Sequence, residues 1–84
     1  MEAKKFKVII VEDVKLELKG TEEIFRHEIP DAEVIGTAMT EQEFWSLMEV
    51  GVPDLVLLDL GLGGSTTIGV DICRNIFKRY PDVD

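Results

Sequence analysis

The fold is indicated most clearly by two segments, Lys7-Val8-Ile9-Ile10-Val11-Glu12-Asp13 and Pro53-Asp54-Leu55-Val56-Leu57-Leu58-Asp59-Leu60. Each contains a short, continuous run of apolar residues that leads into carboxylate. A strand buried on both faces has such a run, and this pattern is typical of a parallel sheet with helices on both sides. The two segments therefore predict buried strands of an α/β fold.

The carboxylates at the ends of these strands are candidate ligands. In open parallel sheets, ligands bind at the carboxyl ends of the strands, and neighbouring strands would bring Glu12, Asp13 and Asp59 together there. Three carboxylates in one crevice are costly unless a cation lies among them. The alternative is that Asp59 caps the following loop and Asp13 caps the first helix. The occurrence of acidic residues at both strand ends favours a metal site.

Carboxylate oxygens also suit phosphoryl chemistry. Mg²⁺ requires hard oxygen ligands and keeps several waters, so two carboxylates and a loop carbonyl would suit it. A metal beside a carboxylate stabilises the charge on a phosphoryl group, and a carboxylate can accept that group as an aspartyl phosphate. The glycine-rich loop after Asp59 matches no P-loop and no dinucleotide-binding fingerprint.

The rest of the sequence predicts a βαβαβα order without repeats or linkers. We expect strands at 6–11, 32–37 and 55–59, helices at 15–28, 41–50 and 70–80, and a loop at 61–69. Thr40 and Glu43 have the spacing of a capping box at the start of the second helix. Gly20 shares a predicted helix face with Leu16 and Ile24, with Phe25 beside them, which indicates close approach of the first helix to the sheet.

Apolar spacing predicts the buried faces of the other two helices. These sets are Phe44, Leu47 and Met48 in the second helix, and Ile72, Cys73, Ile76 and Phe77 in the third. Trp45 is expected to be partly buried and His27 to be a surface residue. The two threonines, Thr66 and Thr67, are expected in the preceding loop.

Size and composition describe one soluble globular domain, with 84 residues, 45% hydrophobic and 31% charged. The net charge of −8 disfavours direct binding to nucleic acid, which needs clustered Lys and Arg. No stretch approaches the ~20 apolar residues of a membrane span, and Met1-Glu2-Ala3-Lys4-Lys5 lacks the apolar core of a signal peptide, so we expect neither. Its single cysteine cannot form an internal disulfide, so we expect a cytoplasmic protein.

The segments Val8-Ile9-Ile10-Val11-Glu12-Asp13 and Pro53-Asp54-Leu55-Val56-Leu57-Leu58-Asp59-Leu60 resemble the first and third strands of response-regulator receiver domains. These domains are the phosphoacceptor modules of two-component signalling. Gly20, the short second strand and Gly69-Val70-Asp71-Ile72 also fit the family register, so the resemblance covers nearly the whole chain. It implies a flavodoxin-like, three-layer parallel sheet, with residues 1–84 forming a partial receiver domain of three β/α units.

The resemblance also implies a role for each acidic residue. Asp59 would be the phosphoacceptor, and its phosphoryl donor would be a histidine kinase or a phosphotransfer protein. Asp13 would bind Mg²⁺ directly, and Glu12, where the family often has Asp, would bind it directly or through water. Asp59 and the backbone carbonyl of Gly61 would complete the ligand set.

The sequence departs from the family pattern in two respects. The loop after Asp59 lacks the usual Met-Pro pair and carries additional Gly and Ser residues. In addition, the family's fourth and fifth strands, which supply a Ser or Thr and a Lys near the phosphoryl group, have no counterpart. The third strand would then lie at the edge of the sheet, so we expect self-association through it or marginal stability as a monomer.

The function that we expect is that of a phosphoacceptor signalling module, not an enzyme, in which Mg²⁺-dependent phosphorylation of Asp59 drives a conformational or association switch. The alternative is a receiver-like module that is not phosphorylated and serves for interaction or dimerisation. A small flavodoxin-like enzyme or nucleotide-binding fragment ranks lower, because the sequence shows no catalytic base and no phosphate-binding fingerprint.

Overall fold

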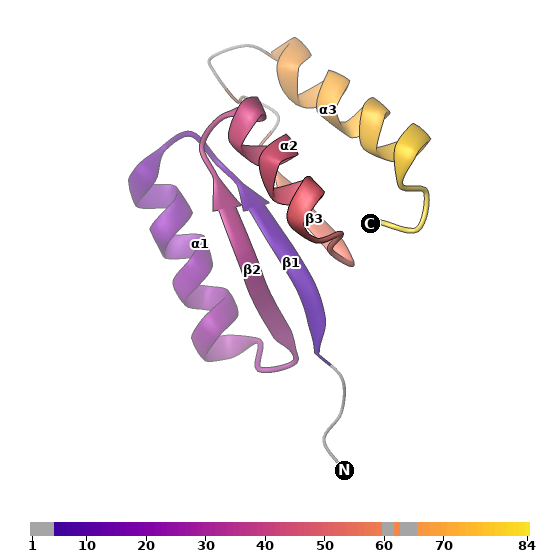
Figure 1. Ribbon diagram of the computed structural model, residues 1–84. Helices are drawn as coiled ribbons and strands as arrows, with labels where there is room; N and C mark the ends of the chain where they lie inside the picture. The colour runs from indigo at the N-terminus through magenta and orange to yellow at the C-terminus, as the bar shows by residue number, and fades with distance from the viewer. Residues whose placement is uncertain (1–4, 60–61, 63–65) are drawn as a thin grey trace.

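The computed structural model describes residues 5–59, 62 and 66–84. Its elements follow in the order β1 (Phe6–Val11), α1 (Lys15–Glu28), β2 (Ala32–Ala38), α2 (Glu41–Val50), β3 (Leu55–Leu58) and α3 (Thr66–Arg79) (Figure 1). The predicted βαβαβα order is confirmed, and every element except α3 begins and ends within one residue of the expected bounds. Within the described ranges, no helix is both long enough and apolar enough to cross a membrane.

The sheet is parallel, with the spatial order β2-β1-β3. β1 is the central strand, and its residues 8–11 are at most 1% exposed. This burial explains the continuous apolar run, because a central parallel strand is covered on both faces. β3 lies at one edge of the sheet, as predicted.

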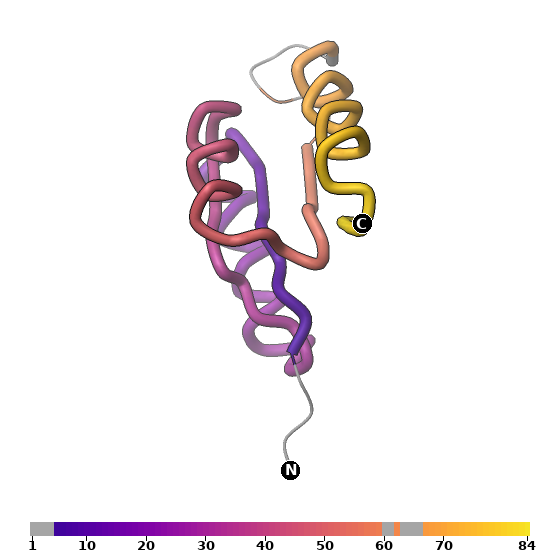
Figure 2. The backbone as a smooth tube through the Cα atoms, turned by 45° about the vertical axis from the view of Figure 1, so that its right-hand side comes forward, coloured from indigo at the N-terminus to yellow at the C-terminus, as the bar shows by residue number. Residues whose placement is uncertain are grey.

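The helices cover both faces of the sheet and give three layers (Figures 1 and 2). α1 packs on one face, where Leu18 and Phe25 join Val8 and Ile10 of β1 in one core cluster. α2 and α3 cover the other face. The buried residues of that second cluster are Ile9, Val11, Ala38, Phe44, Met48, Leu62, Ile72 and Ile76. The predicted three-layer α/β architecture is therefore confirmed.

The face predicted for α1 is only partly correct, because Phe25 is buried as expected but Leu16 and Ile24 are exposed. Leu18 and Phe25 are buried, whereas Leu16 is 82% exposed and Ile24 is 51% exposed. A Cβ atom added to Gly20 would meet nothing within 4 Å. The prediction that Gly20 permits close approach to the sheet is therefore wrong.

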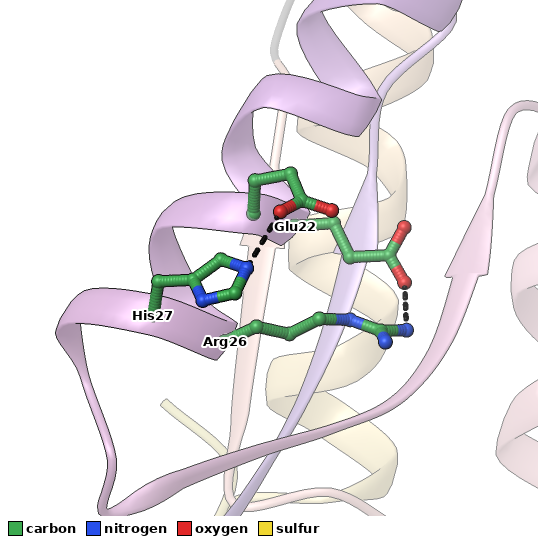
Figure 3. A network of polar contacts seen from close by, with 4 residues as sticks. Glu22, Arg26 and His27 are labelled. Atoms are coloured by element: carbon green, nitrogen blue, oxygen red, sulfur yellow. Dashed lines mark hydrogen bonds and ion pairs between the residues drawn. The ribbon is translucent and has the colours of Figure 1, made fainter.

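Two side-chain pairs stabilise the C-terminal half of α1 (Figure 3). Arg26 donates a hydrogen bond to Glu22 at 2.7 Å, and His27 Nε2 lies 2.8 Å from a carboxylate oxygen of Glu23. Exposed pairs with this four-residue spacing contribute only about 0.3–0.5 kcal/mol. His27 is a surface residue, as predicted.

A close approach of helix to sheet occurs instead at Gly36 in β2. Gly36 pairs with Ile9 of β1, just after a register shift between Val8 and Ile9. A Cβ atom at Gly36 would lie only 2.8 Å from Leu47 Cδ2. The missing side chain therefore allows α2 to pack closely on β2.

The predicted capping box at the start of α2 is confirmed, except that its return hydrogen bond comes from Met39 and not from Thr40. The Glu43 N–H donates to Thr40 Oγ1 at 3.1 Å. The Glu43 carboxylate accepts from the Met39 N–H at 2.8 Å, one residue before the cap. Phe44 and Met48 are buried, and Leu47 is partly buried, as expected.

α3 begins at Thr66, four residues earlier than predicted. The prediction treated Gly69 as part of a loop, but Gly69 is a buried residue inside the helix. Ile68, Ile72 and Ile76 follow one another at four-residue spacing against the core. Their burial offsets the ~1 kcal/mol that a glycine costs within a helix. Thr66 and Thr67 are therefore helical and do not belong to the preceding loop.

The buried face predicted for α3 is only half correct. Ile72 and Ile76 are buried, as expected. Cys73 is exposed and Phe77 is 77% exposed. An apolar residue next to a buried stripe can belong to a second face of the helix, and sequence spacing alone does not separate the two cases.

Candidate functional site

Backbone hydrogen bonds fix the ends of β1 and β3 beside one another. Val11 pairs with Leu58, and the Asp59 N–H donates to the Val11 carbonyl at 3.0 Å. On the other side of β1, the Glu12 N–H donates to the Ala38 carbonyl at 2.9 Å. The first residues beyond two adjacent strands are therefore both acidic and both held by the sheet.

Three carboxylates meet at this edge, as the sequence predicts. Glu12, Asp13 and Asp59 each offer one oxygen that lies within 4.8 Å of the other two. All three residues are partly buried. Gly61, the fourth predicted ligand, lies outside the described residues.

The surroundings of Glu12 shift its pKa. Burial is the main cause that raises the pKa of Glu12 above its usual value, and the neighbouring Asp59 carboxylate raises it further. A hydrogen bond opposes this rise, because Glu12 Oε2 accepts from the Val14 N–H at 3.1 Å. The contribution of Asp59 reflects the closeness of the two carboxylates.

The alternative role of Asp13 as a helix cap is not supported by the position of the helix. The N-cap residue of α1 is Val14, and it makes no side-chain cap hydrogen bond. Asp13 lies one residue earlier, in the cluster with Glu12 and Asp59.

The donor set fits Mg²⁺. All three groups supply hard carboxylate oxygens, which Mg²⁺ prefers, and none supplies the nitrogen or sulfur that would favour zinc. Their partial exposure leaves access for the water molecules that Mg²⁺ retains. Such a cation would balance the negative charge of the three neighbouring carboxylates. The arrangement can therefore hold a hard divalent cation with a nucleophilic carboxylate beside it.

Leu62 is a residue of this region whose role the sequence analysis did not predict. It is 2% exposed and belongs to the core cluster of β1, α2 and α3. Its N–H donates to the Asp59 carbonyl at 3.2 Å. Leu62 therefore ties the backbone after Asp59 to the core. Leu62 is a single large apolar residue between glycines, which could have indicated burial, but the prediction assigned residues 61–69 to a loop.

A known family model covers most of the chain. The chain matches the family model described as the response regulator receiver domain over residues 8–84. It is 30% identical over 79 residues to the transcriptional regulatory protein DegU of Brevibacillus brevis, covering 94% of this chain and 32% of DegU. It is 34% identical over 79 residues to a protein-glutamate methylesterase/protein-glutamine glutaminase of Oleidesulfovibrio alaskensis, covering 94% of this chain and 21% of that protein. The chain thus spans a third or less of these two relatives.

Solved structures show the same relationship. The receiver domain of the PhyR response regulator from Erythrobacter litoralis has a TM-score of 0.77 at 30% identity, with 95% of this chain and 59% of that chain covered. The signal receiver domain of the response regulator merR from Colwellia psychrerythraea has a TM-score of 0.77 at 26% identity, with 93% and 61% covered. The predicted flavodoxin-like receiver fold is confirmed, and this chain belongs to the response regulator receiver domain family.

Proposed function

We propose that Asp59 is a phosphoacceptor that receives a phosphoryl group from a histidine kinase or a phosphotransfer protein. The observation that carries the proposal is the group of three carboxylates within 4.8 Å of one another at two paired strand ends. Asp13, Asp59 and the carbonyl of Gly61 would hold Mg²⁺, with Glu12 acting directly or through water. Bound there, Mg²⁺ would supply charge stabilisation for the phosphoryl oxygens.

Asp59 would act as the nucleophile. One of its carboxylate oxygens forms a bond to phosphorus while the bond from phosphorus to the donor's imidazole nitrogen breaks, and that nitrogen takes up a proton. The hydrogen bond from the Asp59 N–H to Val11 and the burial of Leu62 hold the backbone on both sides of the nucleophile. This support limits the positions that the carboxylate has to search before reaction.

The direct test is phosphorylation by acetyl phosphate with Mg²⁺, followed by intact mass. We expect the mass of one phosphoryl group to be gained by the wild type and by Asp31→Asn, which alters an exposed carboxylate before the opposite end of β2. Asp59→Asn should gain nothing. Two results would contradict the proposal. One is phosphorylation of Asp59→Asn, and the other is that the wild type and Asp31→Asn are both folded but gain no phosphoryl group.

The exposed apolar side of α1 supports a protein donor. Leu16 follows Asp13 by three residues and is 82% exposed, and Ile24 lies two turns further along the same helix. Large apolar side chains left exposed near a reactive group mark a contact surface. Leu16→Asp should therefore slow transfer from a phosphorylated protein donor while phosphorylation by acetyl phosphate stays unchanged. An equal loss with both donors would indicate damage to the pocket itself.

A second candidate function is association through β3, without phosphorylation. Among the described residues, only Asp84 pairs with the outer edge of β3: its N–H donates to the Asp54 carbonyl at 3.0 Å and its carbonyl accepts from the Val56 N–H at 2.8 Å. Leu57 on this strand is 41% exposed. Exposed strand edges of this kind pair with other strands. Sedimentation should show concentration-dependent association that Leu57→Lys abolishes, and a monomer at all concentrations would exclude this function.

We propose in addition that the chain comprises three β/α units of a receiver domain and that it acts in the cytoplasm as a signalling module without enzymatic turnover of its own. The support for the first point is that it covers 59–61% of the two receiver structures compared above.

A further inference from the structure

The outer edge of β2 has no partner in the fold. β2 is an edge strand, and among the described residues it pairs with β1 alone. In this part of the chain, no backbone hydrogen bond from another element reaches the outer side of β2. Its seven residues include one charged side chain, Glu33, and no proline. Charged residues and proline are common means of preventing a second strand from pairing with an edge, so β2 is weakly protected.

A groove lined by apolar side chains lies directly beside this edge. Two hollows, of about 260 Å³ and 450 Å³, share Leu47 and Val50 of α2 and reach Ile35 and Thr37 of β2. Val50 is 89% exposed, and Val52 at the same groove is 48% exposed. Ile35 is the residue that the register shift leaves without a partner on β1, and it lines the groove. The groove therefore offers apolar contacts to a segment that pairs with β2.

This edge lies on the opposite side of the sheet from the last residues of the chain. Asp84 pairs with the outer edge of β3 through Asp54 and Val56, and β1 separates β3 from β2. Figure 2 shows the C-terminus on the β3 side of the sheet. A strand that continued from Asp84 would therefore extend the sheet beyond β3 and would leave the outer edge of β2 free.

The charged groups around the groove favour a basic occupant. Glu33 and Glu43 line it, and α2 carries two further glutamates but neither Lys nor Arg. Among the described residues that line the groove, Lys7 is the one cation, and it lies opposite Glu33 in the pairing of β1 with β2. The chain as a whole has a net charge of −8. These charges attract a basic segment and repel a second copy of this chain.

We propose that the outer edge of β2 binds an extended, basic segment of another protein as an additional strand. The backbone of the segment would pair with β2, and apolar side chains at its centre would contact Ile35, Leu47 and Val50. Lys or Arg residues at its two ends would lie near Glu33 and Glu43. An added strand suits this place because backbone pairing supplies affinity and the adjoining groove supplies selectivity. A helix in the same groove would leave the outer backbone groups of β2 unpaired.

The test measures binding of a short labelled peptide by fluorescence anisotropy. The peptide has lysines at both ends and alternating valine and threonine between them. One comparison peptide has glutamate in place of every lysine, and the other keeps the lysines but is methylated on alternate backbone nitrogens. We expect each comparison peptide to bind at least about tenfold more weakly. The methylated peptide has the same charge, so its weak binding separates strand pairing from general attraction to an acidic protein.

Variants then locate the binding site. Glu33→Lys and Val50→Ser should each weaken binding on the order of tenfold. Glu33→Gln, which places no like charge opposite Lys7, should weaken it about threefold. The matched controls on α3 are Asp71→Lys, which changes the net charge as Glu33→Lys does, and Phe77→Ser, which removes another exposed apolar side chain. Both controls should bind as the wild type does, and all of these residues are exposed, so the unfolding curves should match.

Hydrogen exchange gives an independent measure of strand pairing. The amides of β2 should exchange more slowly in the complex, whereas those of α1 should be unchanged. The proposal is overturned if the lysine peptide does not bind, if either comparison peptide binds equally well, or if Glu33→Lys and Val50→Ser bind as the wild type does. A wild-type dimer that Val50→Ser dissociates would show that a second copy occupies this edge, which also overturns the proposed partner. No step requires phosphorylation, so the result is independent of the chemistry proposed for Asp59.

Discussion

Without divalent cations, Asp59→Asn should be more stable than the wild type. The relevant oxygens of Glu12, Asp13 and Asp59 lie no more than 4.8 Å apart. At this separation two unit charges repel by about 0.9 kcal/mol in the dielectric constant of water, and by more where the site is partly buried. Removal of the Asp59 charge relieves its repulsion with two neighbours. We therefore expect the free energy of unfolding to rise by about 1–2 kcal/mol.

Excess Mg²⁺ should reverse this order. A ligand that binds only the folded state stabilises it by ~2.7 kcal/mol when its free concentration is about 100 times its Kd. The wild type should gain this stabilisation, and Asp59→Asn should gain much less because it lacks one charged ligand. The two proteins are thus expected to exchange rank when EDTA is replaced by Mg²⁺.

The assay is urea unfolding followed by the fluorescence of Trp45, the only tryptophan. Trp45 suits this purpose because it packs edge-on against Phe44, with ring centroids 4.8 Å apart, and beneath Arg79. Asp31→Asn is the control and should follow the wild type in both buffers. The reasoning is refuted if Asp59→Asn is less stable than the wild type in EDTA, or if Mg²⁺ stabilises both proteins equally.

The remaining predictions concern pH, packing and capping. Because folding raises the pKa of Glu12, the folded state retains a proton that the unfolded state loses. The free energy of unfolding should therefore fall as the pH rises from the ordinary pKa of glutamate through the raised one. Glu12→Gln should remove this pH dependence, as measured by urea titrations without divalent cations. Gly36→Ala should cost about 1–3 kcal/mol, because its Cβ would overlap Leu47, and a smaller cost in a Leu47→Ala background would confirm the cause in a double-mutant cycle. Thr40→Ala should lower the free energy of unfolding by about 1 kcal/mol through loss of the bond from the Glu43 N–H, and an unchanged thermal midpoint would count against this cap.

The parts of the fold that were predictable from sequence are those with a strong local signal. The apolar runs before Glu12 and Asp59 are long and end abruptly, so β1 and β3, and the carboxylates beyond them, fall where expected. Continuous apolar runs mean burial on both faces, which in a parallel sheet also fixes the end at which ligands gather. The position of the candidate site therefore follows from two strands and the direction in which they run.

The errors arose where one residue type has two physical uses. The sequence analysis assigned Gly20 to a close approach and Gly69 to a loop, whereas the structure uses Gly36 for close approach and buries Gly69 inside α3. The difference depends on which side chain lies opposite, and this is a tertiary property that the local sequence does not contain. For the same reason, the apolar residues Cys73 and Phe77 did not reveal that they face away from the core.

The hydrogen bond from the Val14 N–H to Glu12 links the acidic pocket to the start of α1. The Glu12 carboxylate lies in the acidic pocket and also holds the start of α1, because its Oε2 accepts a hydrogen bond from the N–H of Val14, the N-cap residue. A cation or proton that claims this oxygen competes with the helix for it. The charge state of the pocket and the start of α1 therefore depend on the same carboxylate.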